Sequence, residues 1–139
     1  MNKYLIHEIV SDGYERFAVI KRISDYAQFN VHFIEYSEYL ENGEQSKIKK
    51  VGDIIQGDFS IELVTKNKIV NQELFYIQRI PQSPNIEAVV EITQIISEDS
   101  VYALSSISNE NLWIEFEGPV NYTLGDRVFI VGALEIDIK

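Results

Sequence analysis

The sequence predicts a mainly β protein built from two related β-modules in tandem, with little helix. Apolar residues recur at every second position in most segments, as in Leu112, Ile114 and Phe116, and a strand with one face in the core requires this alternation. Turn-forming residues separate these segments. A Gly-Asp turn followed by an alternating run with a second glycine occurs twice, from Val51 to Glu62 and from Leu124 to Asp137.

The same alternation predicts six strands besides the one at Leu112. These strands cover Phe17–Ile23, Phe29–Tyr36, Ile54–Val64, Ala88–Ile96, Val101–Ile107 and Arg127–Ile138. Asn42-Gly43 predicts a hairpin between 31–39 and 45–49, because both residues tolerate positive φ. For Ile34–Leu40 and Val70–Ile77 the spacing leaves helix and strand open.

A proline-marked segment predicts where one module ends and the next begins. Pro81 and Pro84 bound residues 81–84, which we expect to be a linker. The first module then covers 1–80 and the second 85–139. Ala18-Val19-Ile20 is echoed by Ala88-Val89-Val90, 70 residues later; chance similarity between short strands is the alternative.

Four segments of the second module carry a resemblance to a known fold. They are Ala88–Ile92, Val101–Leu104, Trp113–Phe116 and Leu124–Leu134. Together they resemble an OB-fold or a related small Greek-key barrel over about 50 residues. The resemblance implies a binding scaffold that stacks bases on aromatic residues beside a basic groove. In residues 85–138, however, Arg127 is the single basic residue among many acids. We therefore expect the fold to be present but not to bind nucleic acid.

Net charge restricts the partners that the chain can bind. The sequence has 22 acidic and 12 Lys or Arg residues, a formal charge of −10, and a pI near 4.6. An anionic surface repels phosphate backbones and anionic lipids and attracts cationic molecules. We therefore expect a cationic protein as partner and expect neither nucleic acid nor membrane. Solubility alone is the alternative reason for the charge.

Composition also indicates the compartment. The sequence contains no cysteine, which removes disulfides and thiolate metal sites. Residues 1–8 lack the apolar core of a signal peptide, and no apolar run approaches the ~20 residues of a membrane-spanning helix. These absences predict a cytoplasmic protein.

Catalytic chemistry has no support in the sequence. His7 and His32 are the only side chains that titrate near neutral pH, and neither has the spacing of a metal site or a triad. Glu115 with Glu117, and Glu135 with Asp137, share strand faces, but alternating acids opposite an apolar face are also typical of the solvent side of a sheet. We expect no enzyme activity, no cofactor and no metal.

A tyrosine-rich acidic segment is the predicted partner-binding site. It comprises Glu35, Tyr36, Glu38, Tyr39, Glu41 and Glu44. Tyrosine brings large contact area, and carboxylates there would pair with Lys or Arg of a partner. The alternative places the tyrosines half-buried over the end of a barrel. Lys47, Lys49 and Lys50 follow this segment, either as a phosphate-contacting patch or as lysines that protect an edge strand.

These features predict a non-enzymatic acidic protein-binding module. In its small size, acidity and lack of cysteine, the chain is similar to bacterial toxin-immunity proteins. That resemblance implies an immunity or antitoxin-like inhibitor that blocks a basic toxin or nuclease, with its carboxylates in place of substrate phosphates. The alternatives are a nucleic-acid-binding tandem OB-like barrel and a structural or assembly subunit. The sequence leaves the oligomeric state open.

Overall fold

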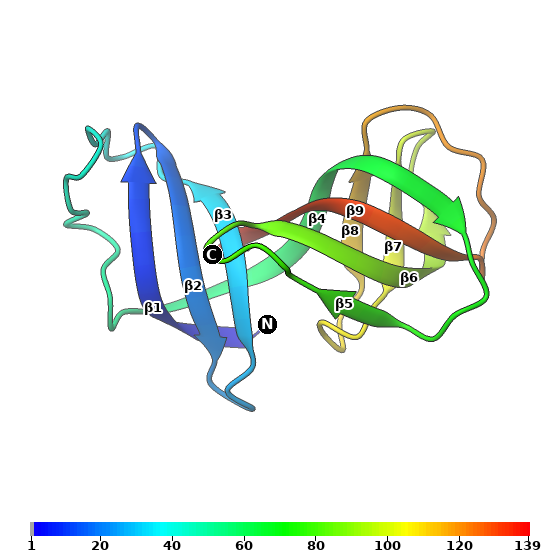
Figure 1. The fold of residues 1–139 in the computed structure, drawn as a ribbon, viewed down its shortest axis with the longest axis horizontal. Helices are drawn as coiled ribbons and strands as arrows, with labels where there is room; N and C mark the ends of the chain where they lie inside the picture. Colours follow the sequence, from blue (N-terminus) through cyan, green and yellow to red (C-terminus); the bar gives the residue numbers. More distant parts are fainter. Residues whose placement is uncertain (1) are drawn as a thin grey trace. The chain divides into compact units, whose positions relative to one another are not determined.

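The protein is an all-strand structure in the computed structural model, which describes residues 2–139 (Figure 1). Its strands are β1 (Asn2–Asp12), β2 (Glu15–Arg22), β3 (Gln28–Ile34), β4 (Ile54–Ile69), β5 (Phe75–Ile77), β6 (Asn85–Ile95), β7 (Ser100–Leu104), β8 (Leu112–Phe116) and β9 (Arg127–Ile138). The described residues contain no helix. The predicted mainly β class is therefore confirmed.

Alternating residues divide between core and surface as the sequence indicates. On β8, Leu112, Ile114 and Phe116 are buried, whereas Trp113 and Glu115 face outward. Strand β9 buries Val128, Ile130, Leu134 and Ile136 in the same manner. Burial of apolar side chains at about 25 cal/mol per Å² stabilises such faces and fixes which residues point inward.

Some local predictions are wrong. Residues 45–49 form no strand, so Asn42-Gly43 does not join a hairpin. Ile34–Leu40 and Val70–Ile77 contain no helix; the second range ends in the short strand β5. Strand β1 was not among the predicted strands, although Tyr4 and Ile6 alternate and are fully buried.

Contacts divide the chain into two compact units, each made of separate segments. Unit 1 contains Met1–Asp58, Ile80–Pro84 and Glu135–Lys139, and unit 2 contains Phe59–Arg79 and Asn85–Leu134. Strands β4 and β9 are each shared, because one part of the strand belongs to unit 1 and the other to unit 2. Residues 81–84, the predicted linker, lie in unit 1. The module boundaries at 80 and 85 stay a prediction.

Unit 1 is a closed ring of five strand segments. Strand β1 pairs antiparallel with β2 and β2 with β3 (Figure 1). The end of β9 then runs parallel to β3, with His32 opposite Glu135, and lies beside β4. The start of β4 returns to β1, where Asn2 is opposite Gly57. The remaining two members of the ring are the shared strands: we number as fourth the strand that pairs with the first, here β4, and as fifth the strand that runs parallel to the third, here β9.

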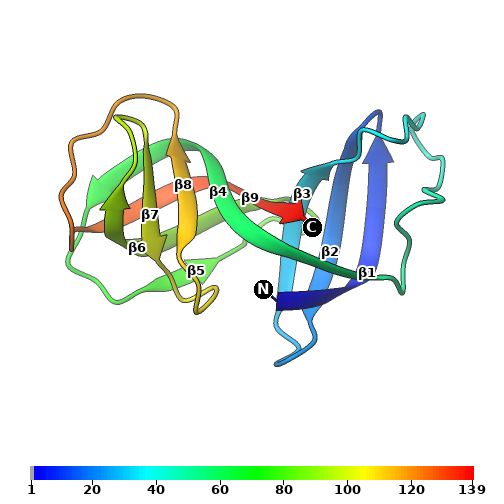
Figure 2. The same cartoon turned by 180° about the vertical axis from the view of Figure 1, so that it is seen from behind.

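Unit 2 forms a ring with the same order. Strands β6, β7 and β8 pair antiparallel in sequence (Figure 2). The distal part of β4 then runs parallel to β8 and lies beside β9, which pairs antiparallel with β6. Strand β5 adds to β6 outside the ring. Here β9 takes the fourth position and β4 the fifth, the reverse of unit 1.

The two Gly-Asp turns make matching hydrogen bonds in their own units. Gly52 N donates to Ile6 O at 2.9 Å, and Gly125 N donates to Ile92 O at 2.8 Å. Both glycines have positive φ, 94° and 87°, a conformation that glycine adopts without steric cost. Ile6 on β1 therefore corresponds to Ile92 on β6.

This correspondence corrects one part of the sequence comparison. Ala88-Val89-Val90 belongs to β6, whose place in its ring is that of β1. Ala18-Val19-Ile20 belongs to β2. The two similar triplets therefore lie on strands that are not equivalent, whereas the two Gly-Asp turns lie at equivalent places in their rings.

Candidate functional site

The predicted partner-binding residues lie on one connection of unit 1, the β3–β4 loop, which we define as residues 35–53. This loop contains Glu35, Tyr36, Glu38, Tyr39, Glu41 and Glu44. Its backbone is anchored to the β1–β2 turn by two hydrogen bonds, between Gly13 N and Leu40 O at 2.8 Å and between Leu40 N and Gly13 O at 3.0 Å. The Leu40 side chain is buried, so the loop is packed onto its unit.

A buried arginine holds the middle of the loop. Arg16, on β2, is 0% exposed. Its Nη1 donates to Gly13 O at 2.9 Å and to Glu15 O at 3.0 Å, and its Nη2 donates to the main-chain oxygen of Glu38. Because a buried guanidinium needs partners for its N–H groups, these carbonyls fix both the side chain and the loop segment that supplies one of them.

The carboxylate of Glu38 is used inside the loop. It accepts hydrogen bonds from Ser46 Oγ at 2.6 Å and Lys47 N at 2.9 Å, and it pairs with Arg16 Nη2 at 3.4 Å. The Ser46 hydroxyl, then the Lys47 amide, hold the pKa of Glu38 below its ordinary value. Glu38 therefore organises the loop rather than presenting a free charge.

Two more of the predicted carboxylates are also bound within the loop. Glu35 pairs with Lys49 Nζ, and this hydrogen bond lowers the pKa of Glu35. Glu44 Oε1 accepts a hydrogen bond from Glu41 N at 2.8 Å. Within the part of the chain that the structure describes, the Glu41 carboxylate makes no hydrogen bond and is exposed. Glu41 is thus the predicted acid best placed to meet a partner.

The tyrosines of the loop face solvent. Tyr36 is 80% exposed and Tyr39 60% exposed, and Tyr14 on the adjoining turn is 47% exposed. Tyr14 and Tyr39 pack edge to face, with ring centroids 5.1 Å apart and planes at 75°. Gly13 leaves room for the Tyr39 ring, because an added Cβ would lie 3.3 Å from it. We use the name tyrosine patch for Tyr14, Tyr36 and Tyr39, the exposed tyrosines of this loop and of the turn that adjoins it.

The basic cluster after the loop acids is partly neutralised. Lys49 pairs with Glu35, whereas the side chains of Lys47 and Lys50 are exposed. No strand covers residues 45–50, so protection of an edge strand does not explain these lysines. Lys47 and Lys50 therefore remain as two exposed lysines that follow Tyr36 and Tyr39 closely in the sequence.

His32 lies between two carboxylates on the surface of unit 1. Its Nδ1 is 2.8 Å from both Glu135 carboxylate oxygens, and its Nε2 is 3.2 Å from Glu15 Oε1. The hydrogen bond to Glu135 raises the pKa of His32 most, against burial, which lowers it. Glu15 raises it further. Both ring nitrogens donate only in the charged imidazolium, so this arrangement favours the protonated ring.

A shallow depression lies on the β1–β2 face of the same unit. Its volume is about 200 Å³, and it is lined by Glu8, Val10, Phe17, Ala18, Val19 and Gln82. Gln82 Nε2 donates to Glu8 Oε2 at 2.8 Å across its rim. Sequence reasoning missed this site, because it depends on the return of residues 80–84 to unit 1.

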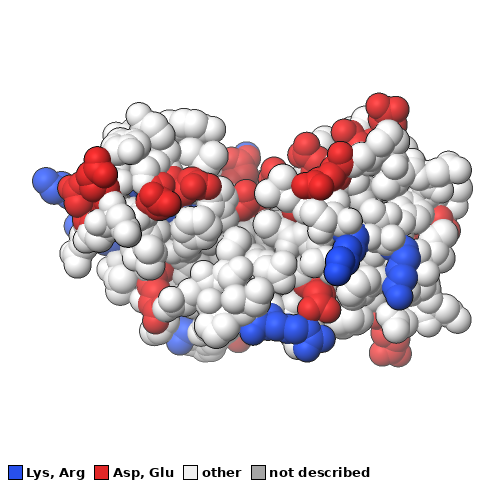
Figure 3. All heavy atoms as spheres, turned by 45° about the horizontal axis from the view of Figure 1, so that its top comes forward, with Lys and Arg blue, Asp and Glu red and all other residues white. Residues whose placement is uncertain are grey.

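Charged side chains on one face of the protein are scattered rather than gathered in a single patch (Figure 3). On the face drawn in Figure 3, acidic side chains form several separate groups amid uncharged surface. Among residues 2–139, no group of three or more His, Asp or Glu residues is arranged to hold a metal ion. No helix within that range is long and apolar enough to cross a membrane.

Comparison with known proteins gives no match to a family model, to a curated protein or to a solved structure.

Proposed function

We propose that this chain is a non-enzymatic protein-binding module that inhibits a basic toxin or nuclease, as an immunity or antitoxin-like protein does. The observation that carries the proposal is the tyrosine patch: Tyr36 and Tyr39 are exposed on the β3–β4 loop, which the fully buried Arg16 holds, and Tyr14 is exposed on the adjoining β1–β2 turn. Exposed aromatic side chains on a rigid backbone are typical of binding surfaces, because little conformational entropy is lost on association. The net charge of −10 supports a cationic partner.

The roles of the loop residues differ from those predicted by the sequence alone. Tyr36 and Tyr39 anchor the partner, and Glu41 pairs with one of its cations. Glu35, Glu38 and Glu44 act indirectly, since their carboxylates hold the loop in shape. Charge attraction chiefly speeds association, whereas the buried rings slow dissociation.

A nucleic-acid-binding tandem OB-like barrel is the second candidate, favoured by one observation. Each unit closes five strand segments in a ring whose third and fifth members are parallel and whose fourth returns to the first. This Greek-key connectivity supports the OB-like reading, and such folds bind oligonucleotides. The acidic balance and the pairing of Lys49 with Glu35 oppose it.

Inhibition of a nuclease tests the first proposal. Basic toxin nuclease domains, beginning with any encoded beside this chain, would cleave a fluorescent RNA in the presence of the purified protein. We expect stoichiometric inhibition, and we expect the double variant Tyr36→Ala/Tyr39→Ala to weaken it about 100-fold, since two interface aromatics typically contribute ~1–2 kcal/mol each. Tyr26→Ala is the matched control, because Tyr26 is also 80% exposed but lies on the β2–β3 turn.

Oligonucleotide binding separates the two candidates. A labelled single-stranded oligonucleotide at low salt should not bind the protein. Binding tighter than micromolar, lost when Lys47 and Lys50 are replaced by Gln, would contradict the inhibitor proposal and support the nucleic-acid module. Equal inhibition by the double variant and the control would show that the tyrosine patch is not the contact surface.

A further inference from the structure

Two aromatic residues form a right-angled corner on the outer face of unit 2. Tyr102 on β7 is directly opposite Trp113 on β8. Their ring centroids are 5.4 Å apart, and the planes meet at 82°. Both side chains are partly exposed, while their neighbours Ala103 and Ile114 are fully buried on the other face. We call this pair the aromatic corner.

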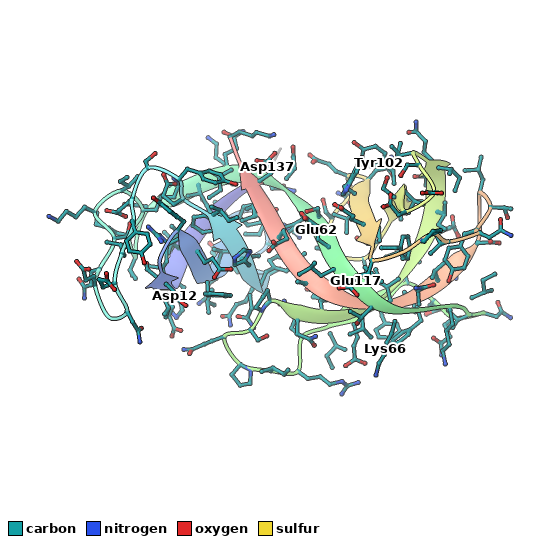
Figure 4. The ribbon with its side chains drawn as sticks, turned by 90° about the horizontal axis from the view of Figure 1, so that it is seen from above. Asp12, Glu62, Lys66, Tyr102, Glu117 and Asp137 are labelled. Atoms are coloured by element: carbon teal, nitrogen blue, oxygen red, sulfur yellow. The ribbon has the colours of Figure 1, made fainter. Side chains whose placement is uncertain are left out.

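Carboxylates adjoin the aromatic corner on two strands. On the side of β8 away from β7, Ser60 of β4 is opposite Trp113. Glu62 follows two residues later on the same face of β4. Ser60 Oγ donates to Glu62 Oε2 at 2.8 Å, which orients that carboxylate. Glu115 lies two residues beyond Trp113 on β8, about 7 Å along the strand. Figure 4 shows Glu62 and Tyr102, which belong to the strands on either side of β8.

Unit 1 has a comparable group of side chains around a histidine of the chain itself. There the third strand places His32 opposite Phe17 of the second strand and opposite Glu135 of the fifth. The imidazole lies 5.0 Å from the Phe17 ring and between the carboxylates of Glu15 and Glu135. Unit 1 thus combines an aromatic ring and two acids around an imidazole of the chain itself.

Unit 2 has the aromatic rings and the acids, and β8 carries no basic side chain. The cation–π contacts made by the described residues are those of Arg22 with Phe29 and of Lys68 with Phe129. Neither involves Tyr102 or Trp113. Since aromatic faces and carboxylates both attract cations, the corner has the chemistry of a cation site without a cation from the described chain.

We propose that the aromatic corner, with Glu62 and Glu115, binds a lysine or arginine side chain of a protein partner. The cation lies against the indole face of Trp113, the strongest cation–π acceptor among side chains, and its charge pairs with the adjacent acids. The net charge of −10 steers such a group toward the surface. This inference rests on the proposed cationic partner and adds a second contact point, distinct from the tyrosine patch.

Trp113 provides a direct reporter, because it is the only tryptophan of the sequence. The test titrates the full chain with the peptide acetyl-Gly-Arg-Gly-amide and follows tryptophan fluorescence. The same peptide with citrulline in place of arginine is the neutral probe of equal shape. We expect saturable quenching by the arginine peptide and at least about fivefold weaker binding of the citrulline peptide, the difference expected from about 1 kcal/mol of cation–π and ionic attraction.

Matched variants locate the effect. Glu62→Gln and Tyr102→Leu should each weaken the arginine peptide several-fold, whereas Glu73→Gln removes an exposed acid of the same unit, outside the face of the corner, and should leave affinity unchanged. Tyr36→Ala/Tyr39→Ala should also bind the peptide normally. This double variant separates the two proposals, because it should lose nuclease inhibition but keep normal binding of the arginine peptide.

Three outcomes would overturn the cation site. They are equal quenching by the citrulline peptide, unchanged affinity in Glu62→Gln, and saturation of Trp113 by a neutral oligosaccharide or an oligonucleotide instead of the arginine peptide. The first two would leave the tyrosine patch proposal intact, because its readout does not depend on Trp113.

Discussion

Arg16 illustrates how a single residue organises the β3–β4 loop, which the sequence pattern describes only in part. An arginine is rarely fully buried, and nothing in the alternation of β2 distinguishes this one from a surface residue. Its three carbonyl partners belong to the β1–β2 turn and to the β3–β4 loop, so they are apparent only once these two segments are folded together. The sequence singles out these six residues as a set, and their contact with a partner stays a prediction, whereas the internal hydrogen bonds of Glu35, Glu38 and Glu44 could not be predicted.

The stability of the protein should depend on the protonation of His32. Glu135 and Glu15 raise the pKa of His32 in the folded state. The stabilisation that the protonated ring provides is therefore fully present below the pKa of histidine in the unfolded state, about 6.5. That contribution is lost as pH rises through the higher folded pKa. We expect the free energy of unfolding, measured with urea between pH 5.5 and 8.5, to fall with pH, with a slope of at most about 1.4 kcal/mol per pH unit.

Histidine variants provide the control for this pH dependence. His32→Gln should abolish the slope. His7→Gln should retain it, because His7 is exposed on β1 and makes no hydrogen bond within the described residues. A slope that persists in His32→Gln would assign the pH dependence to another group.

At the scale of elements, side-chain alternation identified most strands. The predicted range Arg127–Ile138 matches β9, and Leu112–Phe116 matches β8. Strand β1 was missed because a β-bulge between Ile6 and Glu8 interrupts its alternation, so that Tyr4 and Ile6 are buried whereas Leu5 and Val10 are exposed. Alternation could not reveal that β4 and β9 each continue through two rings, because it reports which face of a strand is buried and not which strands lie beside it.

Two glycines allow β4 and β9 to approach each other closely, once in each unit. A Cβ at Gly57 would lie 2.4 Å from Asp137 O, and a Cβ at Gly132 would lie 2.7 Å from Glu62 O. Because these contacts are with backbone, the strands themselves must separate. We expect Gly57→Ala and Gly132→Ala each to lower the free energy of unfolding by about 2 kcal/mol in urea denaturation.

Gly118→Ala is the control for both glycine variants. Gly118 has no atom within 4 Å of an added Cβ, so its substitution should change stability by less than about 0.5 kcal/mol. If all three variants were equally stable, close approach of β4 and β9 would not be the reason for glycine at positions 57 and 132.

At the scale of the whole molecule, neither unit is formed by one continuous stretch of chain. Unit 2 needs Phe59–Ile69 of β4, and unit 1 needs Glu135–Ile138 of β9. Residue composition around Pro81 and Pro84 indicated a boundary, but composition cannot reveal that a strand before it pairs with strands after it. A division into two units could therefore be predicted, but not that the units share β4 and β9.

Fragments test this interdependence. We expect the fragment 85–139, the predicted second module, to remain largely unfolded alone, because β8 would lack its parallel neighbour from β4. Mixing it with fragment 1–84 should restore the β-sheet signal in far-ultraviolet circular dichroism and dispersed amide resonances. A cooperatively folded 85–139 fragment would contradict the expectation and support the module boundary predicted from sequence.

The parallel pairing of His32 with Glu135 joins residues separated by 103 positions, and this has a consequence for synthesis. A ribosome makes β9 after the other eight strands described here. Until β9 leaves the exit tunnel, neither ring can close, and β3, β4 and β6 each have an unpaired edge. Such edges are templates for association with other nascent chains. Productive folding in the cell should therefore depend on chaperones that shield these edges until β9 has left the exit tunnel.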